Sequence, residues 1–140
     1  MIRANRMLTV KASVTLFACL IYGCEREYSV TEIANDTIVE EGEQLFNYHC
    51  LACHGAGQGM PPFPLLPGTG ALQVKYNGSI PAVLADRTDL TPQLVEYFVR
   101  TGVSIMPAYR KTEISDKDLA LIGEYLSRNN PDLQRDESSK

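Results

Sequence analysis

The chain has 140 residues, enough for one small domain, and a formal net charge of −4 at pH 7. An acidic chain is a poor candidate for binding nucleic acid or an anionic membrane surface, because like charges repel. The first 23 residues carry three bases and no acid, so the remainder of the chain is more acidic than the whole.

Residues 1–23 predict an export signal. A basic start with Arg3, Arg6 and Lys11 precedes an apolar run that is too short for a typical membrane span. The run ends with a small residue before Cys24, which resembles a bacterial lipoprotein signal and implies a lipid on Cys24. An uncleaved signal anchor and ordinary cleavage to a soluble protein are the alternatives. We therefore expect a periplasmic protein that contacts the membrane through its N-terminal anchor only.

Residues 24–39 are polar, with no strong periodicity, and predict a tether or a mobile arm. The domain is expected from residue 40 to residue 130, beginning with a helix whose apolar residues share one face. These residues are Gly42, Leu45, Phe46 and His49. The first turn contains the acidic residues Glu40, Glu41 and Glu43, which interact favourably with the positive end of the helix dipole.

This helix leads into Cys50-Leu51-Ala52-Cys53-His54, which has the C-x-x-C-H form of a c-type haem attachment site. Cys50 and Cys53 are one helical turn apart, so both thiols can form thioether bonds with one haem. His54, from the same turn, can bind the iron. A thioredoxin-like pair or half of a zinc site are the alternatives, but no βαβ pattern surrounds the pair and zinc needs two more ligands. The expected cofactor is one covalent haem c, and electron transfer is the leading function.

Glycines and prolines alternate from Gly55 to Pro81, which predicts an ordered loop without a long regular element. The loop also contains apolar residues, namely Met60, Phe63, Leu65 and Leu66. A loop of this composition must cover an apolar body, and a haem ring is suitable.

Two further helices follow. Thr91 and Pro92 predict the start of one helix and Gly102 its end. Ser115 predicts the start of the last helix, which ends at the Asn129-Asn130-Pro131 sequence. The apolar stripe of the first helix consists of Leu94, Val95, Phe98 and Val99. The stripe of the last helix consists of Leu119, Ile122 and Leu126, and Leu121 and Tyr125 adjoin it. Residues 131–140 predict a flexible tail, and since no strand pattern is visible, the fold class is all-α.

A haem-motif helix, a Gly/Pro-rich loop and a Met-Pro sequence between two later helices together resemble class I cytochrome c over nearly the whole domain. The resemblance implies that Met106 is the second axial ligand, opposite His54. Pro107 favours an extended backbone at Met106. Outside the signal the other methionine is Met60, which is too near His54 in sequence to reach the opposite haem face easily. Ordinary core packing is the alternative for Met106.

The same resemblance implies roles for several other residues. Pro64 resembles the family proline whose carbonyl accepts a hydrogen bond from the second nitrogen of the haem histidine, with Pro67 as the competitor. Gly42 and Phe46 resemble the first-helix residues that meet an aromatic residue of the last helix, here Tyr125. Four residues are candidates for binding the haem propionates, with ordinary surface roles as the alternative: Lys75, Tyr76, Arg87 and Arg110.

The C-terminal half, best in Val99-Arg100-Thr101-Gly102 and the Met-Pro sequence, is similar to the cytochrome subunits of flavocytochrome hydroxylases such as 4-cresol methylhydroxylase. This implies a flavin- or quinone-dependent dehydrogenase as redox partner, and a protein that transfers electrons without being an enzyme itself. A membrane-tethered shuttle to a terminal oxidase or reductase is the alternative. A haem peroxidase or ligand sensor is the alternative of another class.

Overall fold

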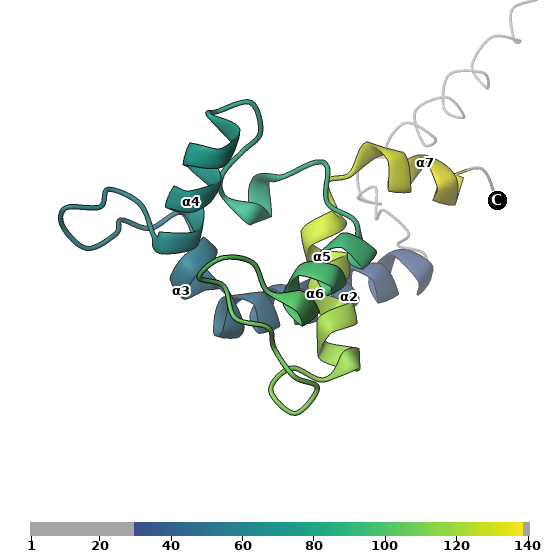
Figure 1. The fold of residues 1–140 in the computed structure, drawn as a ribbon. Helices are drawn as coiled ribbons and strands as arrows, with labels where there is room; N and C mark the ends of the chain where they lie inside the picture. Colours follow the sequence, from purple (N-terminus) through teal and green to yellow (C-terminus); the bar gives the residue numbers. More distant parts are fainter. Residues whose placement is uncertain (1–29, 139–140) are drawn as a thin grey trace, which may run out of the picture. The chain divides into compact units, whose positions relative to one another are not determined.

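The computed structural model describes residues 30–138, and from Thr31 onward these belong to one compact unit. In chain order the described helices are α2 (Val30–His49), α3 (Leu51–His54), α4 (Pro67–Tyr76), the 3-10 turn η1 (Leu84–Asp86), α5 (Pro92–Thr101), α6 (Asp116–Ser127) and α7 (Pro131–Ser138) (Figure 1). Apart from one isolated bridge, between Val103 and Met106, these residues form no β-structure. The predicted all-α class is therefore confirmed. The export signal and Cys24 lie outside the described residues.

The core lies between α5, α6 and the end of α2. Its buried residues are Phe46, Leu90, Val95, Val99, Ile114, Leu119, Ile122, Tyr125 and Leu126. The two later helices start where the sequence predicted, because Thr91 Oγ1 accepts from Leu94 N at 3.2 Å and Ser115 Oγ from Asp118 N at 3.1 Å. These caps fix where the apolar stripes of α5 and α6 begin.

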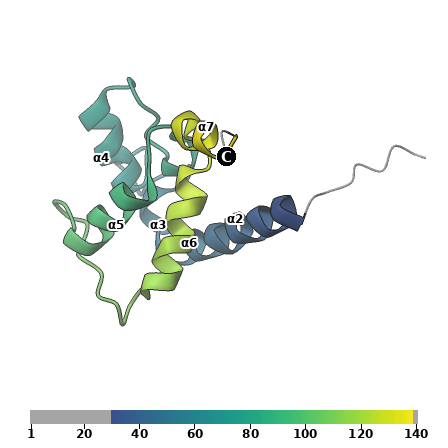
Figure 2. The same ribbon diagram turned by 90° about the vertical axis from the view of Figure 1, so that its right-hand side faces the viewer.

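Helices α2 and α6 meet at Gly42 (Figure 2). A Cβ at this position would lie 2.2 Å from the carbonyl oxygen of Leu121, so no larger residue fits without a shift. One turn further, the rings of Phe46 and Tyr125 pack with centroids 5.5 Å apart. The predicted contact between the first and last helices is confirmed.

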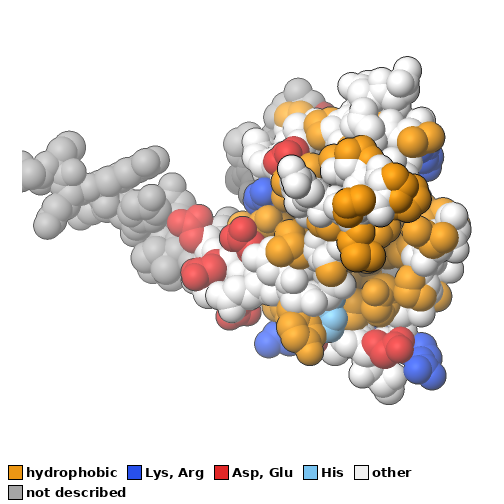
Figure 3. All heavy atoms as spheres, turned by 90° about the vertical axis from the view of Figure 1, so that its left-hand side faces the viewer, with side chains coloured by type: hydrophobic (Ala, Val, Ile, Leu, Met, Phe, Trp, Pro, Cys, Tyr) orange, Lys and Arg blue, Asp and Glu red, His pale blue; other side chains and the backbone are white. Residues whose placement is uncertain are grey.

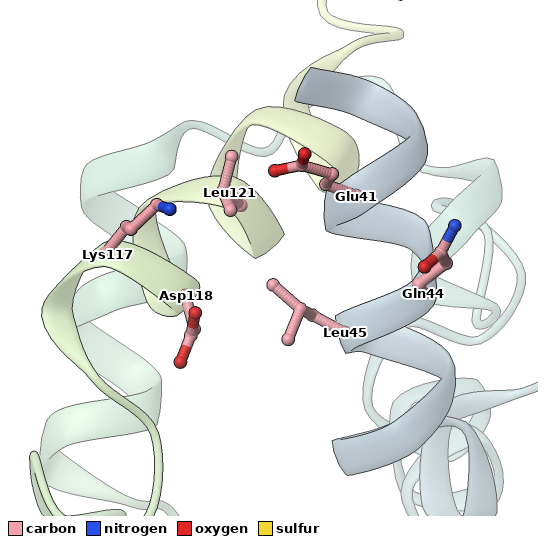
Figure 4. Close-up of a pocket in the computed structure, with 6 residues that line it drawn as sticks. All are labelled: Glu41, Gln44, Leu45, Lys117, Asp118 and Leu121. Atoms are coloured by element: carbon pink, nitrogen blue, oxygen red, sulfur yellow. The ribbon is translucent and has the colours of Figure 1, made fainter. Parts of the chain in front are cut away.

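An open groove of about 320 Å³ lies beside this contact (Figure 4). Its lining comes from both helices and consists of Glu41, Gln44, Leu45, Lys117, Asp118 and Leu121. Leu45 extends from α2 into the space between the two helices. None of the residues expected to bind haem lines this groove, so it takes no part in the site described below.

The segment expected to be an irregular tether is helical where it is described. Helix α2 runs without interruption from Val30, and its side chains from Ala34 to Ile38 are exposed. The helix continues because no glycine or proline occurs between Val30 and Glu41, and the packed end near Phe46 nucleates it. No helix within residues 30–138 is long and apolar enough to cross a membrane.

Helix α4 corrects the prediction that the Gly/Pro-rich segment lacks a regular element. Pro67 occupies the first turn, where proline is favoured because its missing N–H needs no partner. Good helix formers follow Gly70, and the helix ends at Asn77, which adopts a left-handed φ of 47°. The glycines and prolines therefore mark the two ends of this helix more than they disrupt it.

Helix α7 replaces the flexible tail that the sequence predicted from residue 131. Asn130 is buried, and its Nδ2 donates to the carbonyl of Leu90 at 2.8 Å while its Oδ1 accepts from Asp132 N at 3.0 Å. The Asn130 side chain thus caps α7 and ties its start to the core. The sequence predicted a helix stop at Asn129-Asn130-Pro131, but α6 already ends at Ser127 and Pro131 begins α7.

Candidate haem site

The Cys50–His54 motif continues from the packed end of α2. The Cys50 N–H donates to the carbonyl of Phe46 at 2.8 Å, and the His54 N–H donates to the carbonyl of Cys50 at 2.9 Å. Cys50 is half-buried and Cys53 exposed, and neither is in a disulfide. These backbone hydrogen bonds therefore fix the two thiols and His54 relative to the core residue Phe46.

Burial favours the neutral forms of Cys50 and His54. Desolvation, with a smaller contribution from Cys53, raises the pKa of Cys50 to about 11. Desolvation also lowers the pKa of His54 below its ordinary value. A neutral imidazole is the form that binds metals.

The first turn of α4 supports His54 from behind. A Cβ on Gly68 would lie 2.6 Å from His54 Cε1 and 2.7 Å from Nδ1, so a glycine is needed for the ring to lie there. Thr69, which is 1% exposed, donates from Oγ1 to the carbonyl of Gly55 at 2.8 Å. Gly68 and Thr69 were not predicted, because contacts between α3 and α4 leave no local pattern in the sequence.

His54 Nδ1 is buried and has no hydrogen-bond partner among the described residues. The predicted bond from this nitrogen to the carbonyl of Pro64 is therefore absent from this structure, and so is one to Pro67. The Pro64 carbonyl accepts instead from Gly59 N, at 3.4 Å. The Nδ1 edge of the ring faces Gly68.

Met106 lies in a tight turn after α5, outside any helix, and is half-buried against the core. The backbones of Val103 and Met106 exchange two hydrogen bonds, of 3.0 and 2.9 Å, and Ser104 between them has a φ of 53°. Tyr109, three residues later, also packs against the core. Burial raises the pKa of Tyr109, and the charges of Cys50 and Cys53 raise it further.

Large apolar side chains are exposed on the segments around this site. Met60 is 83% exposed, Phe63 70% and Ile105 74%. Hydrophobic side chains gather on the face that carries α3, α4 and the loop between them (Figure 3). Apolar exposure of this kind marks a binding surface. Together with two free thiols in one turn and the His54 imidazole beside them, it fits a covalently attached apolar group such as haem.

Three of the four candidates for the propionates lie together. The Arg87 guanidinium lies over the Tyr76 ring at 4.9 Å, and Lys75 Nζ lies 5.1 Å from the same ring. Arg87 is buried, and its Nε donates to Asp89 Oδ1 at 2.8 Å. A hydrogen bond with Arg87 is the main cause that lowers the pKa of Tyr76.

Arg110, the fourth candidate, is 80% exposed and pairs with Glu113. The zinc alternative gains no support, because within residues 30–138 no three His, Cys, Asp or Glu side chains gather to hold an ion.

Comparison with known proteins gives one family. The sequence model of the family described as cytochrome c oxidase, cbb3-type, subunit III, matches residues 37–126, well over half of the chain. The matched residues include the whole Cys50–His54 motif and Met106. No curated protein and no solved structure matches the chain significantly. The expected likeness to flavocytochrome hydroxylase subunits therefore has no support from these comparisons.

We expect Thr69→Val to destabilise the protein by about 1–3 kcal/mol, because the buried carbonyl of Gly55 loses its donor. The measurement is urea unfolding of the haem-loaded protein. Thr101→Val is the matched control: its hydroxyl is exposed and donates to the carbonyl of Tyr97 within the same helix, so a change within about 0.5 kcal/mol is expected. Equal effects of the two substitutions would contradict this role of Thr69.

Proposed function

The chain belongs to the family described as cytochrome c oxidase, cbb3-type, subunit III, and on that premise we propose that it is a periplasmic carrier of single electrons with His54 and Met106 as iron ligands. As a cytochrome c domain it binds haem c covalently and transfers electrons. The observation that carries the proposal is the Cys50–His54 motif within the matched residues. When bound, the haem supplies one iron that gains and loses a single electron.

The chain's own residues have distinct parts in this proposal. Cys50 and Cys53 form the thioether bonds, and neutral His54 is the proximal ligand. Met106 is the second ligand, which is supported by its position in a half-buried turn outside the helices. Met60 is less suited to this role because it follows His54 by only six residues and is too near in sequence to reach the opposite haem face easily. Two protein ligands leave no open position on the iron, which favours electron transfer over a peroxidase or a ligand sensor.

We expect Met106→Ala to open the iron to external ligands and to lower its reduction potential, because a thioether ligand raises the potential. Carbon monoxide binding to the reduced protein and a potentiometric titration measure the two effects. Met60→Ala is the matched control and should not open the iron to carbon monoxide. An unchanged potential and unchanged carbon monoxide binding in Met106→Ala would refute the ligand assignment.

The proposed electron acceptor is a terminal oxidase. The description of the family that matches this chain names a subunit of an oxidase, and this observation favours an oxidase as the acceptor. A flavin- or quinone-dependent dehydrogenase is the second candidate, supported by the sequence around Val99–Gly102 and Met106.

Purification of the protein from its native membranes should distinguish between these two candidate partners. If the oxidase is the partner, the reduced protein is reoxidised by those membranes in the presence of oxygen, and no flavin or quinone cofactor co-purifies with it in a fixed ratio to the haem. Flavin or quinone cofactor in a fixed ratio to the haem would instead identify a dehydrogenase subunit. The absorption spectrum and cofactor analysis of the purified material decide between the outcomes.

The proposed location is the periplasmic side of a membrane, with the protein tethered through a lipid on Cys24. Cys24→Ser should then move the protein from the membrane fraction to the soluble fraction, with its haem spectrum unchanged. Fractionation followed by haem staining measures this. Retention of the variant in the membrane would favour an uncleaved signal anchor over the lipid.

A further inference from the structure

Arg100 joins α5 to the segment that follows the Met106 turn. Its side chain is mostly buried, with 18% exposed. Nη1 donates to the carbonyl of Tyr109 at 3.1 Å, and Nη2 donates to the carbonyl of Ile114 at 3.0 Å and to Asp116 Oδ1 at 2.9 Å. One side chain therefore connects α5, both ends of the segment 109–114 and the first residue of α6.

The loop that carries Met106 is held at its two ends. It leaves α5 at Gly102, where φ is 69° and a Cβ would lie 2.7 Å from the carbonyl oxygen of Met106. It returns to α5 at Tyr109, whose N–H donates to the carbonyl of Val99 at 2.9 Å. Arg100 bonds the carbonyl of this same Tyr109. The position of Met106 therefore depends on the anchor to which Arg100 contributes.

The two carbonyl contacts distinguish Arg100 from an ordinary surface base. A planar guanidinium presents several donors in fixed directions, whereas a lysine ammonium is a single point. The ion pair with Asp116 is not distinctive, because Lys111 Nζ makes one with the same carboxylate at 2.6 Å. Asp116 is 57% exposed, and exposed pairs of this kind contribute little to stability.

We propose that Arg100 is a positioning residue for Met106: its guanidinium holds the backbone at Tyr109 and Ile114, and so keeps the ligand loop closed over the iron. This inference rests on the proposed His54/Met106 ligation. Without the two hydrogen bonds the loop opens more often, and an external ligand competes more readily with the methionine. Arg100 itself touches neither the iron nor the haem in this account.

The experiment compares Arg100→Gln, Arg100→Lys and Lys111→Gln in the full-length, haem-loaded protein. Imidazole affinity of the ferric protein reports how often the loop opens, and the charge-transfer absorption of the methionine–iron bond reports the closed form. Arg100→Gln is expected to bind imidazole about tenfold more tightly, because charge-assisted hydrogen bonds are lost. Lys111→Gln loses a pair with the same Asp116 but no carbonyl contact, and should bind imidazole as the wild type does.

Arg100→Lys keeps the positive charge but cannot reach both carbonyls, so it should resemble Arg100→Gln. It also serves as the test if Arg100→Gln does not fold. Full recovery in Arg100→Lys would overturn the inference, because charge alone would then suffice. A loss of urea stability without a change in imidazole affinity would also overturn it, because Arg100 would then be merely structural.

The two proposals fail in different ways. A wild-type protein that binds imidazole as readily as Met106→Ala would refute the ligation itself, and this inference with it. A wild type with the methionine–iron absorption and an Arg100→Gln variant identical to it would refute only the role of Arg100.

Discussion

The close approach of α2 and α6 at Gly42 is the constraint on which the rest of the structure depends. Because the Gly42 backbone lies directly against the carbonyl of Leu121, the next turn of α2 can place Phe46 against Tyr125. The Phe46 carbonyl then bonds the N–H of Cys50, so the helix crossing determines where the attachment motif begins. On the other side, α6 packs against α5, from which the Met106 loop extends.

The parts of the fold that could be predicted are those with local causes. Thr91 and Ser115 cap their own helices, and Gly102 ends α5 with a positive φ, so the sequence next to each boundary contains its explanation. Helix α4 was missed because frequent glycines and prolines indicate a loop, although Pro67 also suits a first turn. Helix α7 was missed because Asn129-Asn130-Pro131 was interpreted as the end of one helix, although Asn130 also caps the next one by accepting from Asp132 N.

The candidate site divides in the same way. Cys50, Cys53 and His54 form a contiguous motif whose spacing has a chemical reason, so they could be identified directly. Met106 could be identified only through the resemblance to class I cytochrome c, because nothing local connects it to His54. The side chains that hold the site in place could not be predicted. Thr69 bonds the carbonyl of Gly55 next to His54, and Arg100 bonds the carbonyl of Tyr109 near Met106, and no periodic sequence pattern indicates such contacts.

The supports of the two proposed ligands also come from separate stretches of sequence. His54 is backed by the first turn of α4, whereas the loop of Met106 is fastened to α5 and the start of α6. Substitutions after Pro92 can therefore alter the second ligand while the attachment motif and its backing stay intact. Such an arrangement allows the affinity of the haem for electrons to differ among related proteins while the covalent attachment is kept. The Met106 loop is therefore the part of the chain to change in order to engineer a gas-binding variant.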